Sequence, residues 1–207
     1  AGLLGTFYIF TDTTLVYDGE IAPTSLVREY KERGHEIGSH SSNHSDLGSL
    51  SGTGDYDSLS RVLSESVLLL NERFDQTTLS MSIPFGSFRP GTLDSISNYF
   101  LSARSSQFGF NLATPYDFYA LKSWPILSTT APAFVNDLVT LAETYGYYLP
   151  LMYHDMVDEP FDEAVEIYTY ARDKFRETLQ LALQRNVWIA PHRSIYKYIR
   201  MRNALKI

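Results

Sequence analysis

Residues 34–46, which read GHEIGSHSSNHSD, hold the most informative pattern in this chain. Residues 35–39 (HEIGS) predict a short strand, and the densest polar cluster of the sequence follows at once. Two of the five histidines, His40 and His44, lie in that cluster four residues apart. In a helical or turn-like backbone this spacing puts both imidazoles within reach of one ion, and neutral imidazole is a common zinc ligand. Capping or surface histidines can share the spacing, so the pair by itself leaves both interpretations open.

Outward from this stretch, hydrophobic periodicity predicts strands that alternate with helices. The further strands are expected at residues 3–10, buried on both faces, and at residues 79–85, 101–105, 147–154 and 187–190. The helices are expected from Pro23 to a stop at Gly34, from a cap at Asp57 to Phe74, around residues 93–100, and at residues 133–145 and 162–185. This alternation indicates an α/β fold with parallel strands, either a layered sheet or a barrel, with its chemistry at the carboxyl ends of strands.

The composition fits a single globular domain over residues 1–207. Of the 207 residues, 44% are hydrophobic and 20% are charged, and no linker divides the chain. A net charge of −7 without a basic cluster argues against a nucleic-acid partner, and no apolar run is long enough for a membrane span. The absence of cysteine excludes disulfides, thiolate metal sites and cysteine nucleophiles. The 15 tyrosines are compatible with a sugar-binding cleft and also with an ordinary core.

Two further strand ends carry candidate residues. His154 ends the expected strand at residues 147–154, where it is a candidate general acid or base, or a structural histidine. Residues 83–86 (IPFG) combine a rigid Pro84 with a permissive Gly86. Such a pair can hold a backbone N–H toward a cleft, although an ordinary turn explains it equally well.

Together these segments resemble the polysaccharide deacetylase family, the NodB-homology domain. The similar segments are residues 5–9 (GTFYI), 34–40 (GHEIGSH) with His44, 46–47, 83–86, 152–154 (MYH) and 187–200. The resemblance implies a distorted (β/α) barrel and metal-dependent removal of acetyl groups from an N-acetylated glycan or from acetylated xylan. It also implies an extracellular or cell-envelope location.

The resemblance further implies roles for individual residues. His40 and His44 would be ligands of Zn²⁺, or of another divalent metal such as Co²⁺, which would polarise the acetyl carbonyl and activate water. The backbone N–H of Phe85 would stabilise the oxyanion, and His154 would protonate the leaving group. Pro84 and Tyr153 would contact the polysaccharide or oligosaccharide substrate.

The sequence departs from the family pattern in several places. The family's Thr-Phe-Asp-Asp-Gly motif, which supplies the third metal ligand and the catalytic base, precedes the strand that resembles residues 5–9. Here Asp12 and Asp18 follow that strand instead, so we expect a chain truncated at its N-terminus and lacking the first strand.

Two later motifs also differ from the family pattern. Ser82 replaces an arginine that orients the base in the family, and Arg89 is a candidate substitute. Asp117 is a candidate for the family's fourth motif, which otherwise has no counterpart.

Three readings of the sequence follow. The histidines favour a metal-dependent carbohydrate deacetylase, whereas Ser82 and the missing base favour a catalytically inactive relative that binds glycan. A plain α/β domain with incidental histidines is the third reading. The sequence leaves open which glycan is bound, whether an amide or an ester is cleaved, and the oligomeric state.

Overall fold

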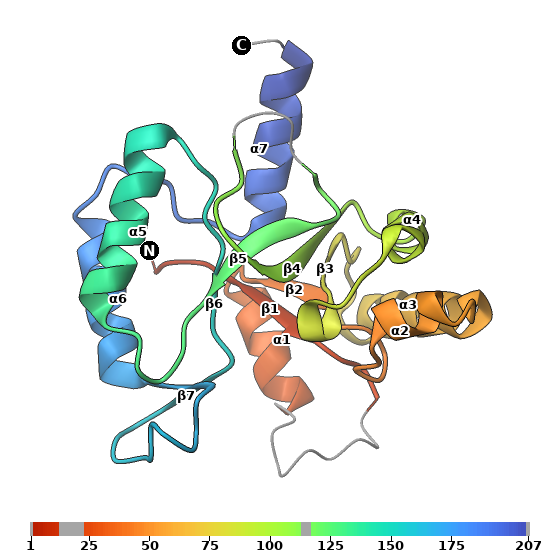
Figure 1. Cartoon of the computed structure of the whole chain (residues 1–207), viewed down its shortest axis with the longest axis horizontal. Coiled ribbons are helices and arrows are strands. Elements are labelled where there is room, and N and C mark those ends of the chain that lie inside the picture. Colours follow the sequence, from red (N-terminus) through yellow and green to blue (C-terminus); the bar gives the residue numbers. More distant parts are fainter. Residues whose placement is uncertain (1, 13–22, 113–116, 206–207) are drawn as a thin grey trace. The chain divides into compact units, whose positions relative to one another are not determined.

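A computed structural model describes residues 2–12, 23–112 and 117–205 (Figure 1). The fold is α/β, as predicted, with a six-stranded sheet in the order β1-β2-β3-β4-β5-β6 and a separate parallel pair, β7-β8. The strands are β1 (Thr6–Ile9), β2 (Glu36–Ser39), β3 (Ser80–Ser82), β4 (Ser102–Phe108), β5 (Leu121–Pro125), β6 (Leu151–Met152), β7 (Asp155–Val157) and β8 (Thr169–Ala171). The helices are α1 (Thr24–Glu32), α2 (Leu47–Gly52), α3 (Tyr56–Phe74), the 3₁₀ turn η1 (Pro84–Gly86), α4 (Pro90–Ser97), α5 (Pro132–Tyr145), α6 (Arg172–Leu183) and α7 (His192–Leu205).

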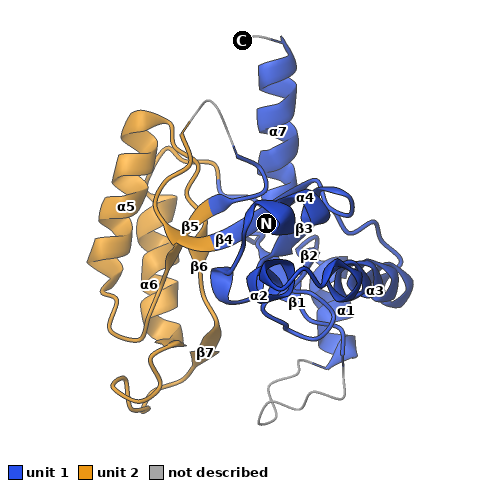
Figure 2. Cartoon of the chain, turned by 45° about the vertical axis from the view of Figure 1, so that its right-hand side comes forward, with its two compact units in different colours: residues 1–105, 117–121, 189–207 blue, residues 106–116, 122–188 orange. Residues whose placement is uncertain are grey.

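The chain forms two compact units, coloured separately in Figure 2. Unit 1 comprises residues 1–105, 117–121 and 189–207, and unit 2 comprises residues 106–116 and 122–188. Whether they act as the single domain expected from the sequence stays a prediction. Among the described residues, no helix has both the length and the hydropathy that a membrane crossing requires.

The register of unit 1 sets where its strands end. β1 pairs with β2 from Thr6↔Glu36 to Ile9↔Ser39, Ser39 pairs with Met81, and Ser82 pairs with Arg104, all in parallel. The carboxyl ends of β1, β2 and β3 therefore lie at one edge of the sheet, where the loops that follow them meet.

The core of unit 1 forms between helices and the sheet. Helix α3 buries Leu59, Val62, Leu63, Leu70 and Phe74 along the stripe predicted from the sequence. Part of this stripe packs with α2, β3 and α4, and the rest packs with α1 and β2. The cap was predicted wrongly, because Asp55 rather than Asp57 accepts the hydrogen bond from the Ser58 N–H at 3.1 Å.

Other predicted elements differ from the structure. Residues 187–190 form no strand, and the strand expected at residues 147–154 is reduced to β6. The helix expected from residue 162 begins only at Arg172, because residues 169–171 pair with β7. The strand at residues 3–10 is not buried on both faces, since Phe7 is 38% exposed. In each case strand pairing or solvent exposure overrides the local apolar pattern.

A buried polar network joins α7 to the amino ends of the strands in unit 1. The Glu36 carboxylate accepts hydrogen bonds from Thr6 Oγ1 (2.9 Å), Ser80 Oγ (2.7 Å) and the Arg193 backbone N–H (2.7 Å). It therefore lies at the N-terminus of α7, where a helix favours negative charge. Beside it, the buried His192 ring forms a 2.7 Å hydrogen bond with Ser102 Oγ.

This network predicts a pH-dependent stability. Burial lowers the pKa of His192 to about 4. The unfolded chain, with a histidine pKa of about 6.5, therefore binds a proton between these values that the folded chain does not, and stability falls as the pH is lowered. We expect the free energy of unfolding in urea to lose about 3 kcal/mol from this residue between pH 6.5 and pH 4. The His192→Gln variant should lack this component, and identical pH profiles for the two proteins would contradict the prediction.

Candidate functional site

The loop that follows β2 is anchored to its neighbours through backbone hydrogen bonds. The His40 N–H donates to the Ile9 carbonyl of β1 (2.9 Å), and the Ser42 N–H donates to the Val62 carbonyl of α3 (3.1 Å). Ser41 and His44 adopt left-handed conformations, with φ of 65° and 57°. Left-handed backbone in residues other than glycine is uncommon and persists where the surroundings enforce it.

The two histidines converge through this turn. The Nε2 atoms of His40 and His44 are 3.1 Å apart, and the ring centroids are 4.7 Å apart. His40 Nδ1 lies 2.8 Å from the carbonyl oxygen of Ser82 at the end of β3. A carbonyl only accepts hydrogen bonds, so Nδ1 carries the proton and the Nε2 lone pair of neutral His40 faces His44.

This arrangement fits two ligands of one divalent ion. Two nitrogens bound to a tetrahedral zinc ion at about 2.0–2.1 Å lie about 3.3 Å apart, close to the observed separation. A histidine ligand whose second nitrogen donates to a backbone carbonyl is the common arrangement at such sites. Among the described residues, no group of three His, Cys, Asp or Glu side chains is placed to hold a metal, so no third ligand is identified there.

Burial and two aromatic rings shape the surroundings of His44. Burial lowers the pKa of His44, which favours the uncharged form that can bind a metal. The ring of Phe85 meets His44 edge to face at 4.6 Å, and the ring of Phe10 lies 6.0 Å away.

The turn η1 brings Phe85 to the histidine pair. Pro84 is buried at its start, whereas the side chain of Phe85 is 66% exposed. Phe85 has φ of 58°, and the following Gly86 has φ of 63°. Phe85 and His44, which lie on separate segments of the sequence, are thus in contact. The oxyanion role of the Phe85 N–H and substrate contact by Pro84 stay predictions.

An arginine that the sequence reasoning did not identify lies next to Ser82. Arg104, the register partner of Ser82 on β4, donates to Ser82 Oγ, and its guanidinium lies 5.4 Å from the ring of Tyr8. Arg89 instead lies against Gly52 of α2. Arg104 could have been found only from the register between β3 and β4, because 22 positions of sequence separate it from Ser82.

Of the remaining acidic candidates, Asp12 lies next to the loop that carries the two histidines, where its backbone N–H donates to the Ser42 carbonyl (2.7 Å). Asp12, with Asn43 and Glu65, lines a pocket of about 350 Å³ beside the histidine loop. Asp117 accepts from the Tyr119 N–H in a turn (3.0 Å). Asp18 lies outside the described residues.

His154 belongs to unit 2, where it follows β6. Its exposed ring lies 4.8 Å from the ring of Tyr168, which is also exposed. The ring of Tyr153 packs on Tyr170 (5.5 Å) and Phe175 (5.0 Å) in the core of this unit, and burial raises its pKa. The Tyr153 side chain is half-buried, and its contact with substrate stays a prediction.

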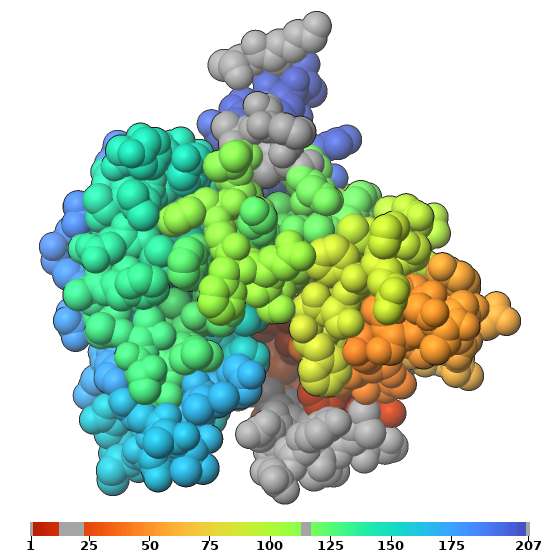
Figure 3. Space-filling model, in the orientation of Figure 1, coloured from red at the N-terminus to blue at the C-terminus, as the bar shows by residue number. Residues whose placement is uncertain are grey.

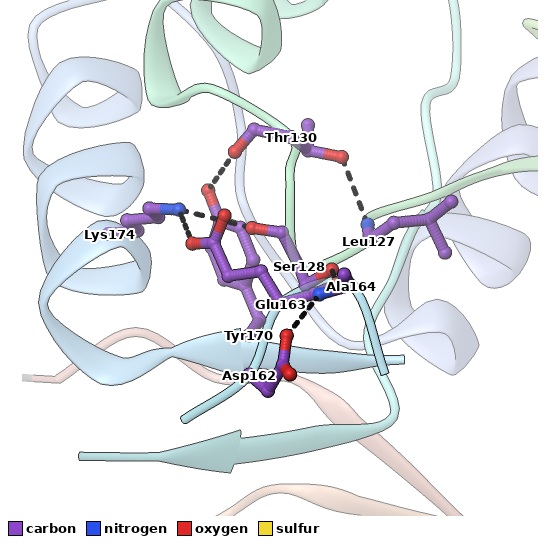
Figure 4. A network of polar contacts seen from close by, with 8 residues as sticks. All are labelled: Leu127, Ser128, Thr130, Asp162, Glu163, Ala164, Tyr170 and Lys174. Atoms are coloured by element: carbon purple, nitrogen blue, oxygen red, sulfur yellow. Dashed lines mark hydrogen bonds and ion pairs between the residues drawn. The ribbon is translucent and has the colours of Figure 1, made fainter. Parts of the chain in front are cut away.

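A polar network fixes the segment of residues 162–170, which carries Tyr168 (Figure 4). Lys174 of α6 forms an ion pair with Glu163 and donates to the Ser128 carbonyl (3.1 Å), while Ser128 Oγ donates to the Glu163 carbonyl (2.7 Å). The Tyr170 hydroxyl donates to the Thr130 carbonyl (3.1 Å). These bonds connect the segment to the turn after β5 and to α6, so the position of Tyr168 beside His154 does not depend on that ring contact alone.

Comparison with known proteins identifies a similar sequence family and similar folds. The sequence profile of the polysaccharide deacetylase family matches residues 1–102. No curated protein sequence matches the chain.

Solved structures share the fold at low sequence identity. A Mycobacterium smegmatis protein described as a polysaccharide deacetylase is 16% identical, with a TM-score of 0.61 over 97% of this chain and 73% of that chain. An acetyl xylan esterase of family 4 from Clostridium thermocellum, in complex with a cobalt ion, is 14% identical, with a TM-score of 0.57 over 95% and 78%. The Streptococcus pyogenes deacetylase PplD, in complex with acetate, is 20% identical, with a TM-score of 0.51 over 57% and 51%, so the chain spans about half of that protein. The α/β fold of the deacetylase type, predicted from the resemblance, is confirmed.

Proposed function

Because the chain belongs to the polysaccharide deacetylase family, we propose that it hydrolyses acetyl groups from a polysaccharide at a divalent metal ion held by His40 and His44. The observation that carries this proposal is the 3.1 Å approach of the two Nε2 atoms, with His40 fixed through Nδ1 by the Ser82 carbonyl. A divalent ion bound there would act as a Lewis acid toward the acetyl carbonyl and would make water more acidic.

The chain's own residues contribute the surroundings of the reaction. The ring of Phe85 covers one side of His44, and its backbone lies in the turn after β3, where an N–H can stabilise an oxyanion. Following the family resemblance, we also propose that the exposed imidazole of His154 in unit 2 protonates the leaving group. We also propose an extracellular or cell-envelope location, in keeping with a polysaccharide substrate.

The proposal is tested by acetate release from acetylated xylan and from chitohexaose, an N-acetylated substrate. We expect release in the presence of Zn²⁺ or Co²⁺, loss of release after treatment with EDTA, and recovery when the metal is added back. The two substrates distinguish ester from amide cleavage. Metal binding without acetate release from either substrate would contradict the proposal and would favour the inactive, glycan-binding relative.

A further inference from the structure

Unit 2 exposes a connected group of aromatic rings that the proposed active site does not use. This aromatic platform comprises Phe108, Phe110, Trp124, Phe134, Tyr145 and Tyr147. All six residues belong to unit 2, so the group does not depend on how the two units are placed. On the face shown in Figure 3, the green surface of the segment after β4 lies beside the blue-green surface of α5.

The rings form a continuous chain of contacts. Trp124 of β5 stacks on Phe108 at 5.7 Å and meets Phe134 of α5 edge to face at 5.8 Å. Phe110 joins Trp124 (6.0 Å) to Tyr147 (5.3 Å), and Tyr147 stacks on Tyr145 at 5.4 Å. β4, β5, α5 and the segments that follow β4 and α5 thus contribute to one surface.

Much of this aromatic surface faces solvent. Phe108 is 65% exposed, Tyr145 60% and Phe134 45%. The rings that link them, Trp124, Phe110 and Tyr147, are half-buried. Single exposed rings are common, but several exposed rings joined through such a connected group are typical of binding surfaces.

The backbone beneath the rings is fixed before any ligand binds. The Asn111 side chain donates to the Lys122 carbonyl (2.9 Å) and accepts from the Lys122 N–H (2.9 Å). Asn111 also pairs with Tyr148 through two backbone hydrogen bonds of 3.0 Å. These contacts hold the segments that carry Phe110 and Tyr147, so little conformational freedom is lost on binding.

The chemistry of the platform favours a neutral, flat ligand. None of its six side chains is charged, and the chain carries a net charge of −7, which disfavours polyanions and anionic membrane surfaces. The C–H faces of β-1,4-linked sugar rings are flat and apolar, and they stack on aromatic rings while phenol hydroxyls bond to sugar hydroxyls.

We propose that the aromatic platform is a glycan-binding surface, separate from the histidine pair, that stacks a neutral β-1,4-linked polysaccharide. The proposal rests on the proposed function only for the choice of ligand class. Binding there requires neither metal nor hydrolysis, so it gives a polymeric substrate an additional attachment point.

The test measures binding of the protein to xylohexaose and chitohexaose by calorimetry in the presence of EDTA. We expect binding to at least one of them and about tenfold weaker binding by the Phe108→Ala/Tyr145→Ala variant. Tyr198→Ala is the matched control, because this tyrosine of α7 is 53% exposed and lies in unit 1. It should bind like the unchanged protein, and circular dichroism checks that all variants fold.

Several results would overturn the proposal. These are no binding to either oligosaccharide, equal binding by the double variant, or binding that disappears with EDTA. If the aromatic platform instead mediates self-association, the unchanged protein self-associates and the double variant is monomeric. Both proteins would then bind glycan equally.

A second readout does not require removal of any platform ring. In a Trp188→Phe variant, Trp124 is the remaining tryptophan, and its fluorescence should change on titration with the oligosaccharide that binds. Binding without this change would contradict the proposal. Failure of acetate release leaves both readouts intact, so the two proposals can fail separately.

Discussion

Replacement of His44 by alanine should abolish divalent-metal binding and reduce acetate release at least about 1,000-fold. Such a loss corresponds to about 4 kcal/mol of transition-state stabilisation, within what a Lewis acid at a reacting carbonyl supplies. The reason is geometric, because the Nε2 atoms of His40 and His44 face each other at 3.1 Å and removal of one ring leaves half of this chelating pair. Calorimetric titration with Zn²⁺ or Co²⁺ measures the first effect, and acetate release measures the second.

The same chain offers a matched control at the other end of β2. His35 accepts from the Gly5 N–H through Nδ1 (3.0 Å) and packs on Phe7, so it is a structural histidine. His35→Gln should retain metal binding. If His44→Ala binds the metal with unchanged affinity, the ion is held elsewhere and the proposed centre is wrong.

Replacement of Glu36 by alanine should lower the free energy of unfolding by about 4 kcal/mol. Its buried carboxylate accepts from Thr6, Ser80 and the first turn of α7, and its removal leaves these donors without an acceptor in the core. Glu36→Gln keeps the shape and one carbonyl oxygen, so an intermediate loss is expected. Urea unfolding at pH 7 measures both variants.

The control for Glu36 is a glutamate of similar charge on the surface. Glu29 of α1 pairs with Arg33, and both side chains are largely exposed, so Glu29→Ala should cost less than about 1 kcal/mol. A Glu36→Ala protein as stable as Glu29→Ala would show that the network is not a major source of stability. Glu36 begins β2, and His40 directly follows its last residue. A loss of stability in Glu36→Ala therefore also tests how firmly the network holds the strand that presents His40.

Much of unit 1 was predictable from local sequence. Residues 34–46 contain both a strand and the turn that presents the two histidines, and the stripe of α3 repeats at helical spacing. Such features depend on neighbours within a few positions, so periodicity and turn chemistry reveal them. The same reasoning failed at residues 162–171, where apolar residues at helical spacing form an exposed segment and strand β8.

The sequence by itself determined the α/β fold and the family resemblance, and it predicted that His40 and His44 lie within reach of one ion. Only the tertiary structure decided that the Ser82 carbonyl orients His40, that Phe85 meets His44, and that Arg104 rather than Arg89 contacts Ser82. The physical reason is range. The spacing of two side chains within a turn of five residues can be read from the local sequence, whereas contacts between strands depend on register, which is set by packing of the whole sheet.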